Sequence, residues 1–372
     1  PDGTLLPTWV GTSLTGVSSA LFVVLAGVGL TLLTKNTTDV FTSRMQLSLR
    51  ALALIMIGLL LGHAGSNVAI ILVHYGVLFF LAMWCIQLSS RALTVMAVSW
   101  VVLSPILHGV LTRFMQLQAG GTTSYVENWR LWTSPTLLDV VQQPVLMLWD
   151  IFFTGYYPVI SFFGYVLLGM AIGRTNMHKW SIGVRLLAIG GLSYGVCRGL
   201  AAWLLTDSAF ANRIAHATGV PVEQLPAMST TGASVNTDLA MGAPHWYGLA
   251  VPHSGAPLDI YSTAGAAMAV IGFCLLITRI GLVRKILFPL SAAGRVALTA
   301  YVVHVLVTGL WPTNWSQTLH VDDPMFTDAW IMLIVHWVIV VAIGVTVHFA
   351  GVRGPLESLL RKVSSVGSAA KR

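Results

Sequence analysis

The chain has 372 residues, of which 56% are hydrophobic and only 9% carry a charge. A soluble domain carries about a quarter charged residues, so this chain has too few polar side chains to cover a water-exposed surface. The net charge of +7 does not indicate a nucleic-acid partner, because the basic residues form no cluster with interleaved aromatics. The cysteines Cys85, Cys197 and Cys274 stand singly, so we expect neither a disulfide framework nor a metal site. The composition predicts an integral membrane protein.

Nine apolar segments follow one another along the chain, separated by charges, glycine and proline. A membrane-spanning helix needs about 20 apolar residues, and most segments approach that length. The segments are Leu14 to Leu33, Leu49 to Gly62, Val68 to Leu88, Ala92 to Leu111, Tyr156 to Ile172, Leu186 to Leu205, Ile260 to Ile277, Ala292 to Trp311 and Trp330 to Gly351. We therefore predict an all-α, polytopic helical bundle, a single membrane domain over residues 1–372 with about nine crossings.

The distribution of basic residues predicts the orientation of the bundle. Lysine and arginine are enriched in cytoplasmic loops, and most of the 20 basic residues fall on one side if Pro1 lies outside. We therefore expect an extracytoplasmic Pro1 end and a cytoplasmic C-terminal tail over about 352–372. An outside start with an odd number of crossings also predicts a further helix upstream of Pro1, giving ten in all.

Two predicted outer connections are long, at about 112–155 and 206–257. The first carries Trp129, Trp132 and Trp149, which suit either an amphipathic element at the membrane surface or an aromatic belt. The second contains five prolines among small polar residues, so we expect an irregular loop that acts as a lid or a binding surface.

His74 and Arg198 are among the polar residues that fall inside apolar segments, where such residues are costly and often functional. His74 is either an interhelical hydrogen-bond partner or part of a site. Arg198 keeps its charge, so it needs an acidic partner, water or an anionic ligand, unless its side chain extends to the outer headgroups.

The run from Pro289 to His304 suggests a site that begins in the cytosol. Ser291 is a candidate N-cap, which would leave free amides and a positive helix end beside Gly294 and Arg295. Such an end binds anions. His304 would then lie near mid-membrane, with Tyr301 almost one turn before it. This pattern fits the binding of a phosphorylated donor. Alternatively, Arg295 is an ordinary basic residue at the cytoplasmic end of a span, and His304 is a buried histidine that makes a hydrogen bond in the core.

The predicted outer side has its own polar cluster, in Pro252-His-Ser-Gly-Ala-Pro-Leu-Asp259. His253 lies on a bend rich in glycine and proline, where it is either a neutral imidazole that takes a proton from a hydroxyl or amine or an ordinary loop histidine. Asp259 suits either catalysis or the acidic first turn of a helix. Tyr156 and Tyr157 begin another apolar segment and either contact an acceptor or anchor the helix at the interface.

Five stretches of the sequence resemble the bacterial branch of the heparan-alpha-glucosaminide N-acetyltransferase family, which overlaps the DUF1624, DUF418 and YeiB-like membrane proteins. They are Ala20 to Leu30, His74 to Phe80, Gly155-Tyr-Tyr-Pro158, Pro252-His-Ser-Gly255 and Gly294 to Tyr301. The resemblance implies a ten-helix acyltransferase of the bacterial inner membrane. It would take acetyl-CoA or another acyl-CoA from the cytosol and acylate a sugar of an envelope glycan or glycolipid on the far side.

The resemblance also implies roles for the residues singled out above. In the family, the catalytic histidine precedes the segment that begins at Leu14, but Pro1 to Ser19 contains no histidine. Either the base lies upstream, or His253, His74 or His304 takes its place, or this branch of the family does different chemistry. Candidate catalytic residues are His253, His304, His74 and Asp259; candidate CoA-binding residues are Arg295, Ser291, Gly294 and Tyr301; candidate acceptor-binding residues are Tyr156, Tyr157, Arg198 and Ser254.

Other functions fit the same residues. A transporter or flippase of an envelope lipid or small molecule would also use buried arginine and histidine. A non-catalytic membrane partner of an envelope machine is a third interpretation. The expected partners are the lipid bilayer, acyl-CoA and the glycan acceptor, with a homodimer or an envelope-biosynthesis protein as further alternatives.

Overall fold

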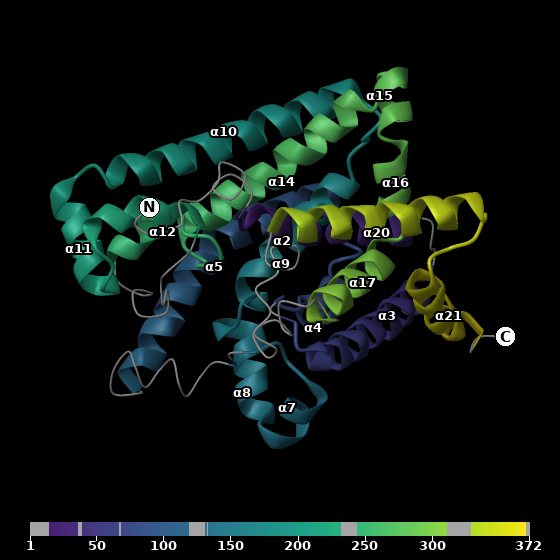
Figure 1. Cartoon of the computed structure of the whole chain (residues 1–372), viewed down its shortest axis with the longest axis horizontal. Helices are drawn as coiled ribbons and strands as arrows, with labels where there is room; N and C mark the ends of the chain where they lie inside the picture. The colour runs from purple at the N-terminus through teal and green to yellow at the C-terminus, as the bar shows by residue number, and fades with distance from the viewer. Residues whose placement is uncertain are drawn as a thin grey trace. The chain divides into compact units, whose positions relative to one another are not determined.

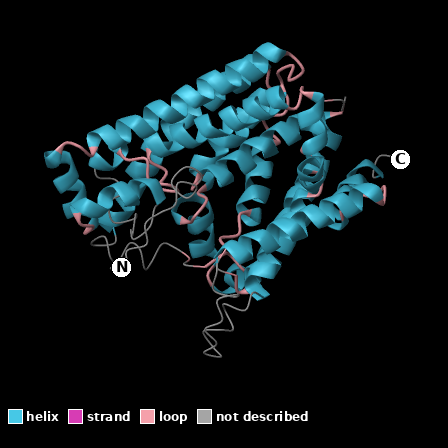
Figure 2. Ribbon diagram, turned by 45° about the horizontal axis from the view of Figure 1, so that its top comes forward, coloured by secondary structure: helices cyan, strands magenta, loops and turns pink. Residues whose placement is uncertain are grey.

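The computed structural model describes residues 15–35, 39–66, 68–118, 131, 133–231, 244–310 and 329–369. Every regular element in these ranges is a helix (Figure 2). The chain divides into two compact units, the first formed by residues 1–38, 84–131 and 145–276, and the second by residues 39–83, 132–144 and 277–372. The all-α, polytopic membrane class predicted from composition is confirmed.

Six described helices are long and apolar enough to cross a membrane, and there are up to eight spans if each of two bent helix pairs counts as one. The predicted segment Val68 to Leu88 is the exception, since its helix covers only Leu72–Ala82. Eleven residues rise about 16 Å, roughly half of the hydrocarbon thickness. The prediction of a full crossing at this segment is therefore wrong, while the other eight segments match the six single spans and the two bent pairs.

The first unit contains most of the long helices. Its elements are α2 (Val17–Thr34), α5 (Ser90–Gln118), α8 (Pro144–Trp149), η2 (Asp150–Thr154), α9 (Val159–Gly173), α10 (Trp180–Leu204), α11 (Ser208–Thr218), η3 (Val222–Gln224), α12 (Leu225–Thr231), η4 (Pro244–Gly248) and α14 (Pro257–Ile277). Helices α10 and α14 run side by side (Figure 1) and meet at Gly190 and Gly265, where a Cβ on either residue would overlap the facing backbone. Small residues allow this close approach, as is usual in membrane helix pairs.

Helix α9 is the centre of the first unit. Nearly all of its side chains are buried, and it packs against both α2 and α5. Gly169 meets the backbone of α2 at Val24, and Thr31 of α2 donates a hydrogen bond to the carbonyl of Met170 at 3.2 Å. The position of α9 is thus fixed on two sides, which holds its first turn in place.

The described parts of the connection at 206–257, residues 206–231 and 244–257, are folded, so the prediction of an irregular loop is wrong there, while the role of a lid or a binding surface stays a prediction. Helices α11 and α12 and the two short 3-10 turns η3 and η4 bury a common hydrophobic core. The core consists of Ala211, Ile214, Val220, Leu225, Met228, Trp246, Leu249, Val251 and Ala256. The prolines delimit short helices here rather than preventing them, because proline is well tolerated at the first position of a helix. The connection therefore forms a folded cap, and Val251 and Ala256 tie it to the bend that carries His253.

The described residues of the connection at 112–155 also form helices for the most part. Helix α5 continues to Gln118, and α7 (Leu137–Gln142), α8 and the π-turn η2 follow. Helix α8 with η2 forms a bent pair with α9, at an angle of 53°. The amphipathic element expected around Trp129 and Trp132 lies outside the described residues.

The second unit contains the remaining elements. They are α3 (Val40–Leu61), η1 (Gly62–Ala64), α4 (Leu72–Ala82), α7, α15 (Gly281–Ile286), α16 (Phe288–Gly294), α17 (Ala297–Leu310), α20 (Ala329–Phe349) and α21 (Pro355–Ala369). Helices α16 and α17 are bent by 86°, where the sequence predicted one continuous span from Ala292. The amphipathic helix α21 packs along α3.

The N-cap predicted at Ser291 is wrong. Ser291 lies inside α16, and its amide donates to the carbonyl of Leu287 at 2.9 Å. Helix α16 begins at Phe288 with Pro289 in its first turn, a position that proline favours. The free amides belong instead to α17, which starts at Ala297. The expected anion-binding helix end is therefore displaced from Ser291 by about two turns.

Candidate active site

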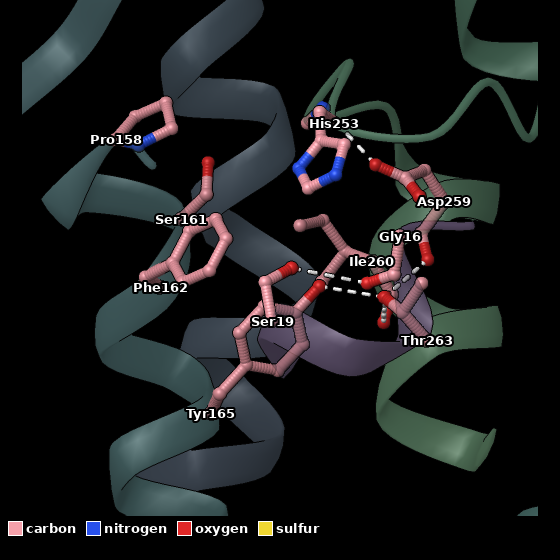
Figure 3. Close-up of a pocket in the computed structure, with 11 residues that line it drawn as sticks. Gly16, Ser19, Pro158, Ser161, Phe162, Tyr165, His253, Asp259, Ile260 and Thr263 are labelled. Atoms are coloured by element: carbon pink, nitrogen blue, oxygen red, sulfur yellow. Dashed lines mark hydrogen bonds between the residues drawn. The ribbon is translucent and has the colours of Figure 1, made fainter. Parts of the chain in front are cut away.

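The bend before α14 is held by its own side chains. Asp259, in the first turn of α14, accepts a hydrogen bond from the amide of Gly255 at 3.3 Å through Oδ2 (Figure 3). Ser254 Oγ accepts from the amide of Ala256 at 3.1 Å. Pro257 begins the helix, where its missing N–H costs nothing. Asp259 and Ser254 therefore fix the backbone on which His253 stands.

His253 adopts a left-handed backbone conformation, with φ of +62°, which is uncommon for residues other than glycine, although asparagine, aspartate and histidine adopt it more often than the rest. Its imidazole packs against Tyr156 and Tyr157, at ring-centroid distances of 4.6 and 5.8 Å. His253 precedes α14 and lies outside the spanning helices. Burial lowers its pKa to about 4, because the charged form is poorly solvated there. The imidazole is therefore neutral at physiological pH and able to accept a proton.

A small pocket separates His253 from the first turns of α9. Ser161, Phe162 and Tyr165 of α9 form one side, and His253 with Asp259 and Thr263 forms the other (Figure 3). The two sides are joined by a hydrogen bond of 2.7 Å between the hydroxyls of Tyr165 and Thr263. The pocket has a volume of about 10 Å³, which is room for about one water-sized group. It can hold a reacting oxygen but not a sugar ring.

His108 belongs to this site, although the sequence analysis did not single it out. Its Nε2 lies 2.8 Å from the carbonyl oxygen of Phe153, which accepts, so Nε2 carries the proton. A Cβ on Gly255 would lie 2.5 Å from His108 Nδ1, so the imidazole also abuts the bend. A histidine near the end of the apolar segment Ala92 to Leu111 that was predicted to face outwards was the available signal.

Asp150 is a second residue that sequence reasoning missed. It is buried in η2, where its Oδ1 accepts a hydrogen bond from the amide of Leu131 at 2.8 Å. A Cβ on Gly155 would lie 2.5 Å from Asp150 Oδ2. Asp150 thus supports the turn that leads to Tyr156 and Tyr157, the two rings under His253.

Arg198 is bound by the backbone of the cap. Its guanidinium donates hydrogen bonds to the carbonyl oxygens of Ser229, at 3.1 Å, and Ala250, at 2.8 Å. It also lies over the ring of Tyr194, at 5.8 Å. These contacts tie α10 to the cap at Ala250, which is three residues before His253. A role for Arg198 in acceptor binding remains a prediction.

In the second unit, Arg295 borders a cavity of about 310 Å³. The polar side chains in its wall are Arg295, His348, Arg353 and Glu357. Arg295 donates to Nδ1 of His348 at 2.8 Å. Ser291 and Gly294 are exposed on α16 and do not line this cavity.

The amide end of α17 is occupied by a side chain of the protein itself. Glu357 Oε1 accepts from the amides of Leu298 and Thr299 at 2.9 and 3.1 Å, and its Oε2 accepts from the Thr299 hydroxyl at 2.6 Å. A carboxylate thus fills the anion site that we expected a ligand to use. Of the predicted donor-binding residues on this helix pair, only Arg295 borders the cavity.

The second unit also contains three further candidate residues, Tyr301, His304 and His74, whereas His253 belongs to the first unit. The hydroxyl of Tyr301 accepts from the amide of Ile71, directly before α4, and His74 is buried on α4. The ring of His304 packs edge-on against that of His336, at 4.7 Å. His336 is a further histidine of this unit that the sequence analysis did not single out.

Two family models match the chain. A model described as the catalytic domain of heparan-alpha-glucosaminide N-acetyltransferase matches residues 3–195, just over half of the chain. A model of a protein family of unknown function, DUF418, matches residues 222–367. No curated protein and no solved structure matches the chain. The first match, together with the long apolar helices, shows that the chain belongs to the membrane-bound heparan-alpha-glucosaminide N-acetyltransferase family.

Proposed function

We propose that the protein moves an acetyl or other acyl group from cytosolic acyl-CoA to a hydroxyl or amine of an extracytoplasmic envelope glycan or glycolipid. We place it in a bacterial plasma membrane, with the Pro1 end outside and the C-terminus inside. The family match supports acyl transfer in general. The single observation that carries the proposal is the neutral imidazole of His253, held on two tyrosine rings beside a pocket the size of one reacting atom.

In the proposed reaction, His253 acts as the general base. Its neutral nitrogen takes the proton from the acceptor hydroxyl or amine as that atom attacks the thioester carbonyl. The new bond to the acceptor forms, the carbonyl electron pair moves to oxygen, and the carbon–sulfur bond then breaks. The pair on oxygen returns to re-form the carbonyl, and the thiolate of CoA leaves with the electron pair of the carbon–sulfur bond and receives the proton from the imidazolium.

With a pKa of about 4, His253 is unprotonated at neutral pH and is a weak base before the reaction begins. Negative charge that develops on the nearby carbonyl oxygen favours the imidazolium, so His253 gains basicity as the reaction proceeds. Exclusion of water from a pocket of this size also protects the thioester from hydrolysis.

Asp259, Ser254 and the two tyrosines then act by positioning His253. Asp259 and Ser254 hydrogen-bond to backbone amides of the bend rather than to the imidazole. Tyr156 is 47% exposed, so its free face is available to a sugar ring, which stacks well on aromatic side chains. The acceptor would therefore approach over Tyr156.

For the donor, we propose the cavity beside Arg295. Arg295 and Arg353 supply two positive charges in its wall, which suit the phosphates of CoA. Because Glu357 already occupies the amide end of α17, we assign phosphate binding to the arginines and not to the helix end.

The test is transfer of label from radioactive acetyl-CoA to envelope lipids and glycans in membranes that contain the protein. We expect label in the acceptor fraction for the wild type and for His216→Ala, an exposed histidine on α11 that serves as the control. We expect none for His253→Asn, since asparagine tolerates a positive φ but is no base. His304→Ala tests whether the second unit supplies a base instead. Full transfer by His253→Asn would contradict the proposal.

A further inference from the structure

Ser161 has a hydroxyl that the folded chain does not use. It is the third residue of α9, its side chain is 1% exposed, and it lines the pocket opposite His253. Among the residues that the structure describes, no atom forms a hydrogen bond with Ser161 Oγ. Burying a hydroxyl without a partner is unfavourable, so a position of this kind points to a ligand.

The N-terminal end of α9 also lines this pocket. Pro158 is the N-cap, and its side chain makes no capping hydrogen bond. The amides of Ser161 and Phe162 both donate to the Pro158 carbonyl, at 3.0 and 2.9 Å. The two amides before them have no acceptor within the helix, and the helix dipole adds partial positive charge at this end. Pro158, Ser161 and Phe162 all line the pocket.

The geometry places this positive end directly across from the base. Figure 3 shows the Ser161 hydroxyl directed into the space between Pro158 and His253. Since the pocket holds about one water-sized group, it fits the carbonyl oxygen alone, between the Ser161 hydroxyl and the imidazole, and the acceptor atom would reach His253 from the side of Tyr156. Helix α9 is buried along its length, so its first turn does not shift when charge develops.

We propose that the Ser161 hydroxyl and the first turn of α9 bind the oxyanion that forms on the acyl carbonyl during transfer. This inference rests on the proposed function and adds the group that stabilises its transition state. As the acceptor oxygen or nitrogen bonds to the carbonyl carbon, the carbonyl electron pair moves to its oxygen, which accepts the hydrogen bond from Ser161. When the carbon–sulfur bond breaks, the pair returns to re-form the carbonyl and the thiolate of CoA departs.

The test is steady-state transfer by Ser161→Ala in membranes, measured with labelled acetyl-CoA at varied concentrations. We expect kcat to fall on the order of 10²-fold, the usual effect of removing one oxyanion donor, while KM for acetyl-CoA changes less than about threefold. The thermal midpoint should stay equal or rise, because the variant removes a buried hydroxyl without a partner. Ser161→Thr, which keeps a hydroxyl at the same carbon, should recover part of kcat.

Ser104→Ala is the matched control. Ser104 on α5 is also fully buried and without a partner in the described part of the chain, but it does not line the pocket. We expect its kcat to equal that of the wild type. Wild-type kcat in Ser161→Ala, or an equal loss in both serine variants, would overturn the oxyanion assignment. If His253→Asn is inactive in the same assay, the proposed function survives that result. Absence of transfer by the wild type would overturn both.

Discussion

The ring of His253 packs on the ring of Tyr156, with centroids 4.6 Å apart and planes inclined by 42°. The two residues are almost a hundred positions apart in sequence, yet each lies just before a long helix of the first unit, His253 before α14 and Tyr156 before α9. The contact therefore joins the starts of two helices. It sets the orientation of the imidazole towards the pocket between them.

Tyr156 should act through its ring more than through its hydroxyl. An aromatic pair contributes about 0.5–1.5 kcal/mol beyond its buried area, so Tyr156→Ala should lower kcat/KM by roughly two- to tenfold through poorer positioning of His253. Tyr156→Phe keeps the ring and should stay close to the wild type. The measurement is kcat/KM for labelled acetyl transfer by the two variants. Equal losses in both would mean that the hydroxyl, and not the ring, is responsible.

The pH dependence should reflect the low pKa of His253. Because burial lowers this pKa from 6.5 to about 4, the unfolded chain binds the proton more tightly than the folded chain between these values. The contribution of His253 to folded stability is therefore complete above pH 6.5 and is lost as the pH falls towards 4. Thermal unfolding from pH 4 to 7 should show a weaker pH dependence in His253→Asn than in the wild type.

The same pKa predicts where activity is lost in acid. We expect kcat/KM to hold through pH 6 and to fall only as the pH approaches 4, because the base stays neutral until then. A pH–rate profile with its acid limb at 6.5 would indicate a histidine in an ordinary environment, and therefore a base other than His253.

Gly255 should not tolerate a side chain. Its φ is +69°, and a Cβ would lie 2.5 Å from Nδ1 of His108. We expect Gly255→Ala to destabilise the fold by about 1–3 kcal/mol and to reduce transfer, because the bend that carries His253 must shift. Gly191→Ala is the control, since Gly191 lies in α10 with open space around its Cβ position. Similar thermal midpoints for the two variants would show that the bend is more adaptable than its geometry indicates.

Glu357 should hold the C-terminal helix in place. Its carboxylate receives three hydrogen bonds from the first turn of α17, so Glu357→Gln should cost about 1–2 kcal/mol of stability. Tryptic cleavage at Arg361 and Lys362 of α21 should become faster. Glu223→Gln, at an exposed glutamate, should change neither measurement. Unchanged proteolysis of Glu357→Gln would show that packing against α3 alone retains α21.

The sequence alone predicts the parts of the fold whose signals are local. Pro257 and Asp259 mark the start of α14, and the glycine and proline around His253 mark the bend. Ser291 shows how a local signal misleads. It has the chemistry of an N-cap, but Pro289 just before it sits in the first turn of α16, which therefore begins earlier. The partner of the next helix end is Glu357, more than fifty residues away, so no local pattern reveals it.

The remaining residues of the site could not be predicted from the sequence, for a different reason. Ser161 is one serine within a buried apolar helix, and only the fold shows that its hydroxyl faces a pocket and lacks a partner. His108 joins the site because α5 passes beside Phe153 and Gly255, a tertiary contact. The folded cap was missed because its prolines suggested a loop, whereas apolar residues before and between them, such as Ile214 and Met228, form a core.

Release of free CoA by the purified protein is the most direct test of the central claim, that His253 deprotonates the acceptor of an acyl group carried by CoA. The protein would be incubated in nanodiscs with acetyl-CoA and an envelope glycolipid extract, and the free thiol measured over time. The account predicts thiol release that requires the extract, is lost in His253→Asn and is retained in His216→Ala. Extract-dependent release by His253→Asn at the wild-type rate would contradict it.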